Sequence, residues 1–182
     1  MVGASEACIE KVGSHYFLTQ QPIEALRQLR GKQVSANYKL PLGSARLKCA
    51  SPKSNVYEMD VTFSALQSNV FGLNLCSGHG RKVTISYDTD SHNLVIDRTH
   101  CADVDIPKFD RMAHAQVLPQ NGKLRMHIFV DKSSVEIFCN DGQDVFTLQT
   151  FPSEDQIGIE TFSQKSVTNM ELKWWPLQAI WK

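Results

Sequence analysis

Four acidic side chains are the residues of this sequence that could carry out hydrolytic chemistry. Two carboxylates that face each other roughly 5 to 10 Å apart can cleave a glycosidic bond. Asp131 and Glu136 flank a short polar turn and could be near neighbours, and Asp97 and Asp141 complete the set. Each also has a structural interpretation: Asp131 would cap the turn, Asp141 would be a turn residue, and Glu136 would point to solvent or a neighbouring strand. We favour the structural roles and assign no catalytic residue.

Histidines and serines do not form a recognisable metal or nucleophile pattern. The six histidines are widely separated, with none at the i, i+2 or i+4 spacing of a metal-binding pair. Ser133 and Ser134 fall in the polar turn without a nucleophile-elbow pattern. The glycine-rich run Ser77–Gly80 lacks the lysine and the following helix of a phosphate-binding loop. We therefore expect no metal and no cofactor.

Arg98 and the tryptophans are better suited to holding surfaces together. Arg98 follows Asp97 at a predicted strand end, where a guanidinium could hold a neighbouring loop or a partner surface through paired hydrogen bonds. Trp174, Trp175 and Trp181 are grouped near the C-terminus. Tryptophans clustered beside a final strand are more often core or interface residues than a platform for sugars.

The stretch from Leu124 to Phe151 predicts three strands and two turns, which carry several of these candidate residues. Apolar and polar residues alternate over Leu124–Asp131 and again over Val135–Cys139, as in strands with one buried face. Asn140-Asp141-Gly142 is a strong hairpin signal, because both turn residues must take positive φ. A third strand, Val145–Phe151, would complete an antiparallel meander.

Most of the remaining chain has the same alternating character. Alternating runs cover Val56–Phe63, Phe71–Leu75, Val83–Tyr87, Leu94–Ile96, Ile157–Phe162 and Met170–Trp175. Gln21–Arg30 is the exception: Ile23, Leu26 and Leu29 recur at helical spacing after Pro22, which predicts a short helix. Met1–Tyr16 has no clear period, and Cys101–Val117 is expected to be a long connection. The sequence therefore predicts an all-β, two-layer antiparallel β-sandwich of the jelly-roll or concanavalin type with one short N-terminal helix.

Composition excludes some classes of partner. The 19 Lys and Arg residues balance the 19 Asp and Glu residues, so the net charge of zero gives no general attraction to nucleic acid or to an anionic membrane. No apolar run approaches the roughly 20 residues of a membrane span, and no secretion signal is visible, so the cellular location is not indicated. The five cysteines are odd in number and form no C-x-x-C pair, as expected of small apolar residues on strands.

These motifs together resemble a known module. The run from 129 to 138, FVDKSSVEIF, followed by Asn140-Asp141-Gly142, resembles the signature of the C-terminal β-sandwich module of family 32 glycoside hydrolases. This family comprises invertases, levanases, inulinases and related β-fructosidases. Leu94–Thr99 is similar to the LDRS strand end of that module. Gln21–Arg30 resembles the segment that leads from the catalytic propeller into the sandwich, and Phe151-Pro152, Gly158-Ile159, Trp175-Pro176-Leu177 and Ile180-Trp181 fit as well.

The resemblance implies an accessory role. The family's catalytic residues lie in an N-terminal propeller, in motifs of the WMNDPNG, RDP and EC type, and this sequence contains none of them. It implies a lead-in with a linker helix over residues 1–31, a sandwich over residues 32–182, and the catalytic propeller of the parent enzyme as partner. The parent would hydrolyse β-fructosyl bonds in sucrose, levan or inulin with retention, and this chain alone would be inactive. Asp103–His114 departs from the pattern.

Three functions remain open. The leading hypothesis is a non-catalytic module that supports the propeller and could contribute to a homo-oligomer. The second is a free-standing module that binds fructan or another carbohydrate, and the last is a complete small enzyme using Asp131 or Glu136. An exposed apolar docking face, and self-association through it, is expected at Ile23–Arg30 and the C-terminal tryptophans. The structural and interface candidates are Asp97, Arg98, Asp131, Ser133, Ser134, Glu136, Asn140, Asp141, Gly142, Trp175 and Trp181.

Overall fold

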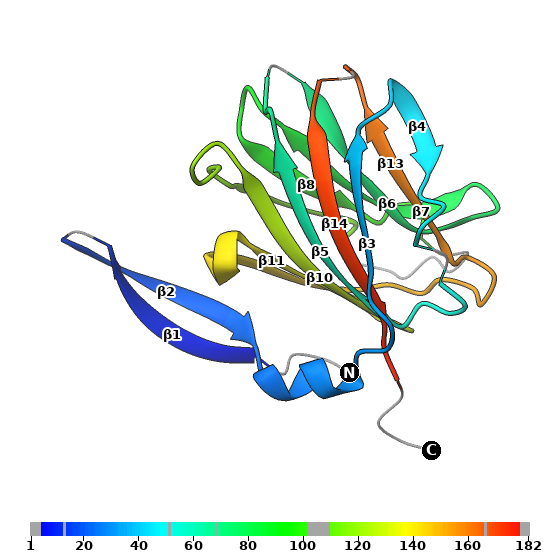
Figure 1. The fold of residues 1–182 in the computed structure, drawn as a ribbon, viewed down its shortest axis with the longest axis horizontal. Coiled ribbons are helices and arrows are strands. Elements are labelled where there is room, and N and C mark those ends of the chain that lie inside the picture. The colour runs from blue at the N-terminus through cyan, green and yellow to red at the C-terminus, as the bar shows by residue number, and fades with distance from the viewer. Residues whose placement is uncertain are drawn as a thin grey trace.

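This chain forms a β-sandwich with a hairpin attached at one end (Figure 1). The computed structural model describes residues 5–12, 14–50, 52–67, 69–101, 110–165 and 167–178. Within these ranges the strands form two six-stranded antiparallel sheets and a separate two-stranded sheet. The all-β sandwich predicted from the alternating runs is confirmed.

The first layer, sheet I, contains the meander that the sequence predicts. Its strand order is β12-β11-β10-β5-β14-β3, and all of its pairs are antiparallel. The strands span Val34–Lys39 (β3), Tyr57–Ser64 (β5), Leu124–Asp131 (β10), Ser134–Cys139 (β11), Asp144–Gln149 (β12) and Asn169–Pro176 (β14).

The second layer, sheet II, has the order β4-β13-β6-β7-β8-β9. Its strands span Gly43–Arg46 (β4), Val70–Gly78 (β6), Arg81–Asp88 (β7), Asn93–Asp97 (β8), Met112–Gln116 (β9) and Gly158–Ser163 (β13). β9 lies inside the stretch that was predicted to be a long connection, so that part of the prediction is wrong. Residues 102–109 of the same stretch, including Pro107, are outside the described residues.

The core lies between the two sheets and follows the period-2 alternation of the strands. In β5 the inward residues Met59, Val61 and Phe63 are fully buried, while Asp60 and Thr62 between them are partly exposed. On the facing sheet, Phe71 packs against Phe63 with 4.8 Å between ring centroids. Apolar burial of this kind is the main stabilising contribution to a sandwich.

The turns of the meander have the expected positions but differ in detail. Asp131 pairs with Ser134, which leaves Lys132 and Ser133 as a two-residue turn. The second turn is a 3₁₀ turn, η2 (Asn140–Gly142), whose three residues all have positive φ, at 46°, 60° and 83°. The positive φ predicted for this turn is therefore confirmed, although the connection is longer than a two-residue hairpin loop.

Two features of the N-terminal region differ from the sequence prediction. The predicted helix is a single 3₁₀ segment, η1 (Glu24–Leu29), preceded and followed by residues in extended conformation. The stretch that shows no clear period forms a hairpin of β1 (Ser5–Val12) and β2 (His15–Pro22). The hairpin extends beyond the sandwich, with η1 at its base (Figure 1). No helix of the described part of the chain is both long and apolar enough to cross a membrane.

Candidate functional site

The junction between η1 and sheet I contains the most deeply buried charge pair among the ion pairs of the described residues. Arg30, just after η1, donates from Nε to Glu58 Oε2 over 2.7 Å and from Nη2 to Glu58 Oε1 over 2.5 Å. His127 Nε2 on β10 also bonds to Glu58 Oε1. Glu58 is only 1% exposed. Its two carboxylate oxygens are therefore satisfied by one residue from the segment that precedes β3, called the lead-in below, and by one residue from the sheet.

The environment of Glu58 favours its charged form. Burial by itself opposes ionisation, but the hydrogen bonds from Arg30 and His127 outweigh it and lower the pKa of Glu58 below its ordinary value. The bonds to Glu58 raise the pKa of Arg30. The Arg30 guanidinium also lies 4.1 Å from the ring centroid of Trp175, a favourable cation–π contact. The lead-in is thus held by charge, by hydrogen bonds and by ring contact.

Backbone bonds join the same lead-in to the end of the last strand. Gly31 N donates to Pro176 O over 2.7 Å, and Gln178 N donates to Leu29 O over 2.9 Å. Arg30 and Leu177 form an isolated antiparallel bridge. η1 is consequently fixed between β5 and the end of β14.

The η2 turn forms a second contact with the lead-in, through β2. A Cβ placed on Gly142 would lie 1.7 Å from Gln20 O, so the β2 backbone passes directly over this glycine. Gln21 Nε2 donates to Asp141 O over 3.4 Å. Asn140 attaches the turn to β10, because its Oδ1 accepts a hydrogen bond from Arg125 N over 3.2 Å. The Asn-Asp-Gly element is therefore the place where the hairpin rests on the sandwich.

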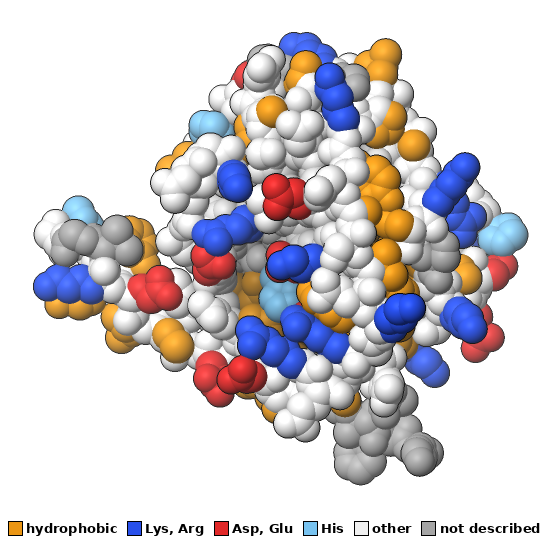
Figure 2. Space-filling model, in the orientation of Figure 1, with side chains coloured by type: hydrophobic (Ala, Val, Ile, Leu, Met, Phe, Trp, Pro, Cys, Tyr) orange, Lys and Arg blue, Asp and Glu red, His pale blue; other side chains and the backbone are white. Residues whose placement is uncertain are grey.

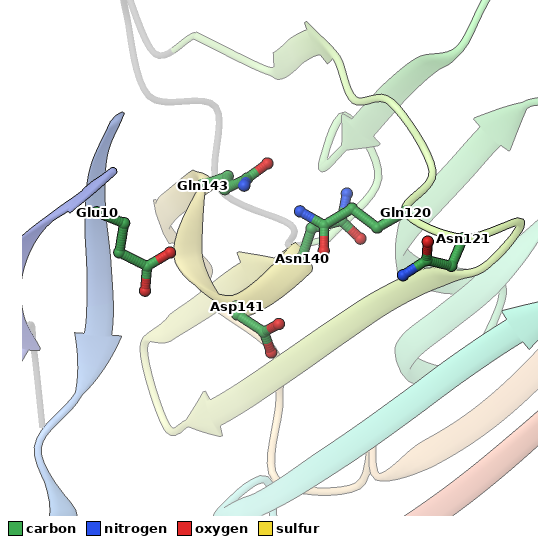
Figure 3. Close-up of a pocket in the computed structure, with 6 residues that line it drawn as sticks. All are labelled: Glu10, Gln120, Asn121, Asn140, Asp141 and Gln143. Carbon is green, nitrogen blue, oxygen red and sulfur yellow. The ribbon is translucent and has the colours of Figure 1, made fainter. Parts of the chain in front are cut away.

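Two polar hollows lie beside this contact. One, of about 420 Å³, is lined by Glu10 of β1 and by Gln120, Asn121, Asn140, Asp141 and Gln143 (Figure 3). The other, of about 250 Å³, lies between the hairpin base and sheet I and is lined by Gln21, Pro22, Arg27, Asp60, Thr62, Arg125, His127, Phe138, Asp141 and Gly142. Figure 2 shows a histidine among basic side chains in a hollow at the base of the hairpin. Amide, carboxylate and guanidinium groups of this kind can hydrogen-bond to hydroxyl groups.

The four candidate acids do not form opposed walls of a cleft. Asp131 lies opposite Ser134 and Glu136 opposite Phe129, so both acids project from the same outer face of sheet I. Glu136 is 7% exposed, which differs from the solvent-facing position considered for it. Asp131 is beside Ser134 at the start of β11, whereas Asp141 lies past the other end of this strand. The strand between them is about 17 Å long. Asp97 is in sheet II, where its Oδ1 accepts from Thr99 N. A glycosidase pair must instead flank the bond that it cleaves.

Arg98 ties two segments of the sandwich together. Its Nε donates to Asp110 O over 2.8 Å and its Nη1 donates to Gln149 O over 2.7 Å. Ser133 is exposed at the two-residue turn, and Ser134 is buried at the start of β11. Trp181 is outside the described residues. Within the described ranges, no three His, Cys, Asp or Glu side chains are grouped so that they could hold a metal ion.

The exposed apolar side chains are not where the sequence prediction placed them. Leu26 of η1 is 9% exposed, and Trp174 and Trp175 are each 6% exposed, so these residues offer little apolar surface. The hairpin instead exposes Ile9 and Leu18, at 74% and 67%. The prediction is wrong for these residues because Trp174 belongs to the core and the Arg30 guanidinium covers the ring of Trp175.

Comparison with known proteins gives one family for this arrangement. The sequence model of the family described as "Glycosyl hydrolases family 32 C terminal" matches residues 23–176. Sucrose-6-phosphate hydrolase of Streptococcus mutans is 32% identical over 161 residues, which are 88% of this chain and 31% of that protein. Levanase of Bacillus subtilis is 27% identical over 169 residues, which are 90% of this chain and 25% of that protein.

Solved structures agree with the sequence comparison. The crystal structure of exo-inulinase from Aspergillus awamori matches with a TM-score of 0.84 and 27% identity, over 97% of this chain and 35% of that one. Sucrose-6-phosphate hydrolase from Lactobacillus gasseri matches with a TM-score of 0.74 and 25% identity, over 96% of this chain and 33% of that one. This chain therefore spans between a quarter and about a third of the length of these four proteins.

Acid titration tests the role of Glu58. Because the folded state lowers the pKa of Glu58, its contribution to stability is present above the ordinary pKa near 4.5 and is lost as the pH falls through the folded value. We expect Glu58→Gln to lower the free energy of unfolding by about 1–3 kcal/mol at pH 7 and by much less at pH 3, as measured by urea unfolding. Glu171→Gln, an exposed change on β14, is the control. A loss that is equal at both pH values would contradict this assignment.

A pair of glycine substitutions tests the contact between η2 and β2. Gly142 and Gly122 both have positive φ (83° and 70°), but a Cβ on Gly122 meets nothing within 4 Å. Alanine at Gly122 should cost only the backbone strain, about 1–2 kcal/mol. Gly142→Ala should cost more and speed amide exchange of Thr19, Gln20 and Gln21, because the added methyl group must displace β2. Equal losses of stability, with unchanged exchange in β2, would show that the contact does not hold the hairpin.

Proposed function

Because this chain belongs to the family 32 glycosyl hydrolases, as their C-terminal domain, we propose that it is the non-catalytic β-sandwich module of a β-fructosidase. The module supports a catalytic propeller that hydrolyses β-fructosyl bonds in substrates such as sucrose, levan or inulin. In this proposal residues 1–31 are the lead-in from the propeller and residues 32–182 are the supporting sandwich.

The arrangement at the junction carries the proposal. Glu58, a buried carboxylate on the outer face of sheet I, binds Arg30 of the lead-in, and Trp175 lies against the same guanidinium. A carboxylate that is fully occupied in this way is unsuited to act as a nucleophile or acid on a sugar. The chain also covers only about a third of the length of two longer relatives, which supports a non-catalytic role for it.

Hydrolysis assays test the absence of catalysis. We expect the 182-residue chain to release no fructose from sucrose, levan or inulin above a protein-free blank, because Asp131 and Glu136 lie on one sheet face and do not flank a bond. Exo-inulinase from Aspergillus awamori, assayed in parallel on inulin, is the positive control. Release of fructose at an enzymatic rate that Glu136→Gln abolishes would establish the small-enzyme hypothesis instead.

Binding of carbohydrate is the second candidate function, and one observation favours it. The hollow of about 250 Å³ combines polar side chains with the ring of Phe138. That ring belongs to an aromatic cluster in which Phe129 lies 6.2 Å from Phe138 and 4.8 Å from His127, between ring centroids. Rings beside hydrogen-bonding groups are typical of sugar-binding surfaces.

Calorimetry distinguishes the two functions. A pure support module should give no saturable heat when fructo-oligosaccharides of the inulin or levan type are titrated into the chain. A saturable isotherm that is abolished by Thr62→Val, a change on the wall of the hollow, would favour the carbohydrate-binding function. Thr147→Val, an exposed change on β12, is the control for a non-specific effect.

A further inference from the structure

One face of the hairpin carries its three most exposed large apolar side chains, whereas Phe17, which is 43% exposed, lies on the other face. In the β1–β2 register, Ile9 lies opposite Leu18 and Lys11 lies opposite Tyr16. Residues that are directly opposite in an antiparallel pair project from the same face. Ile9, Tyr16 and Leu18 therefore share one face, and they are 74%, 68% and 67% exposed. The Lys11 ammonium lies 5.6 Å from the centre of the Tyr16 ring and covers one end of this face.

The opposite face of the hairpin is the one that meets the sandwich. It carries Glu10, which lines the hollow beside η2, and Thr19, which is fully buried. It also carries Gln21, which donates to Asp141 O. Since side chains alternate between the faces of a strand, the face with Ile9, Tyr16 and Leu18 is directed away from the sandwich. We call this face the outer hairpin face.

An exposed face of this kind needs an explanation. A two-stranded hairpin is at best marginally stable by itself in water, and contiguous exposed apolar side chains commonly mark an interaction surface. The contacts of β2 with η2 and β12 fix the hairpin from one side and leave Ile9, Tyr16 and Leu18 in solvent. The sandwich therefore holds the hairpin in position without covering the surface that would gain most from burial.

The comparisons show that the hairpin accompanies the sandwich in a longer protein. The C-terminal family model begins at residue 23, so the hairpin lies outside it. The match to Aspergillus awamori exo-inulinase nevertheless covers 97% of this chain at a TM-score of 0.84, which leaves too few unmatched residues for the hairpin to be among them. In that longer protein the hairpin is therefore retained, and about two thirds of the protein lies outside the match.

We propose that the outer hairpin face is the docking surface for the catalytic domain of a family 32 enzyme, on which it packs sheet against sheet. This inference rests on the proposed function and specifies its contact. A twisted, two-stranded sheet with an apolar face fits best on the apolar face of another sheet, with side chains interdigitating at a spacing of about 10 Å. The hairpin would then belong to the partner's core, while η1 and η2 keep it attached to the sandwich.

Co-purification tests the proposal. The tagged 182-residue chain is co-expressed with the part of Streptococcus mutans sucrose-6-phosphate hydrolase that precedes its C-terminal domain. We expect the two to co-purify, and Ile9→Ser/Leu18→Ser to reduce the recovered partner at least tenfold. Leu42→Ser is the matched control, because Leu42 is also 74% exposed but lies on the sandwich. Tyr16→Ser is a second variant, and thermal unfolding of each variant alone shows whether the sandwich still folds.

Each outcome decides a different question. Loss of the partner with Ile9→Ser/Leu18→Ser or with Tyr16→Ser, but not with Leu42→Ser, supports the docking face. Undiminished co-purification of all variants overturns the docking face while the proposed function stands. No co-purification of the unchanged chain overturns both. Self-association in sedimentation that the hairpin substitutions abolish, without any effect on the partner, would make a second copy of this chain the occupant and overturn the proposal.

Discussion

The ion pair between Arg30 and Glu58 holds the lead-in against sheet I. A carboxylate that is 1% exposed is costly unless its charge is matched and its oxygens are bonded. Glu58 belongs to a central strand of sheet I, whereas Arg30 belongs to the lead-in, so the sheet can bury this acid only when the lead-in is in place. The outer face of the sandwich and the direction of the incoming chain are therefore fixed by the same interaction.

The η2 turn adds a second point of attachment. Two attachments fix the orientation of the segment between them, whereas one would not. Gly142 allows the β2 backbone to pass at a distance that no side chain would permit, and Asn140 holds the turn to β10. With Arg30 at one end and Gln20 at the other, the segment between them cannot swing freely relative to sheet I. The sandwich therefore holds its hairpin in a defined direction, which the proposed supporting function requires.

The sequence alone predicted the β-sandwich but did not predict the contacts of Glu58 and Gly142. Alternation predicted most strands of both sheets, and Asn-Asp-Gly predicted the positive φ at the second turn of the meander. The β1–β2 hairpin was missed because the consecutive apolar residues Tyr16, Phe17 and Leu18 hide the alternation of polar and apolar residues in β2. Glu58 looks like an ordinary outward residue of a half-buried strand, and Arg30 is 28 positions away, with no local pattern to connect the two. Gly142 was predicted for its φ, whereas its contact with Gln20 depends on tertiary structure alone.

Hydroxyl-radical footprinting tests the proposal that the sandwich presents its hairpin to a catalytic domain. The chain would be labelled alone and in the co-expressed complex, and oxidation would be quantified at each residue. We expect strong protection of Tyr16 and Leu18 in the complex, with Leu42 labelled equally in both samples. Unchanged labelling of Tyr16 and Leu18, together with protection elsewhere on the sandwich, would contradict it.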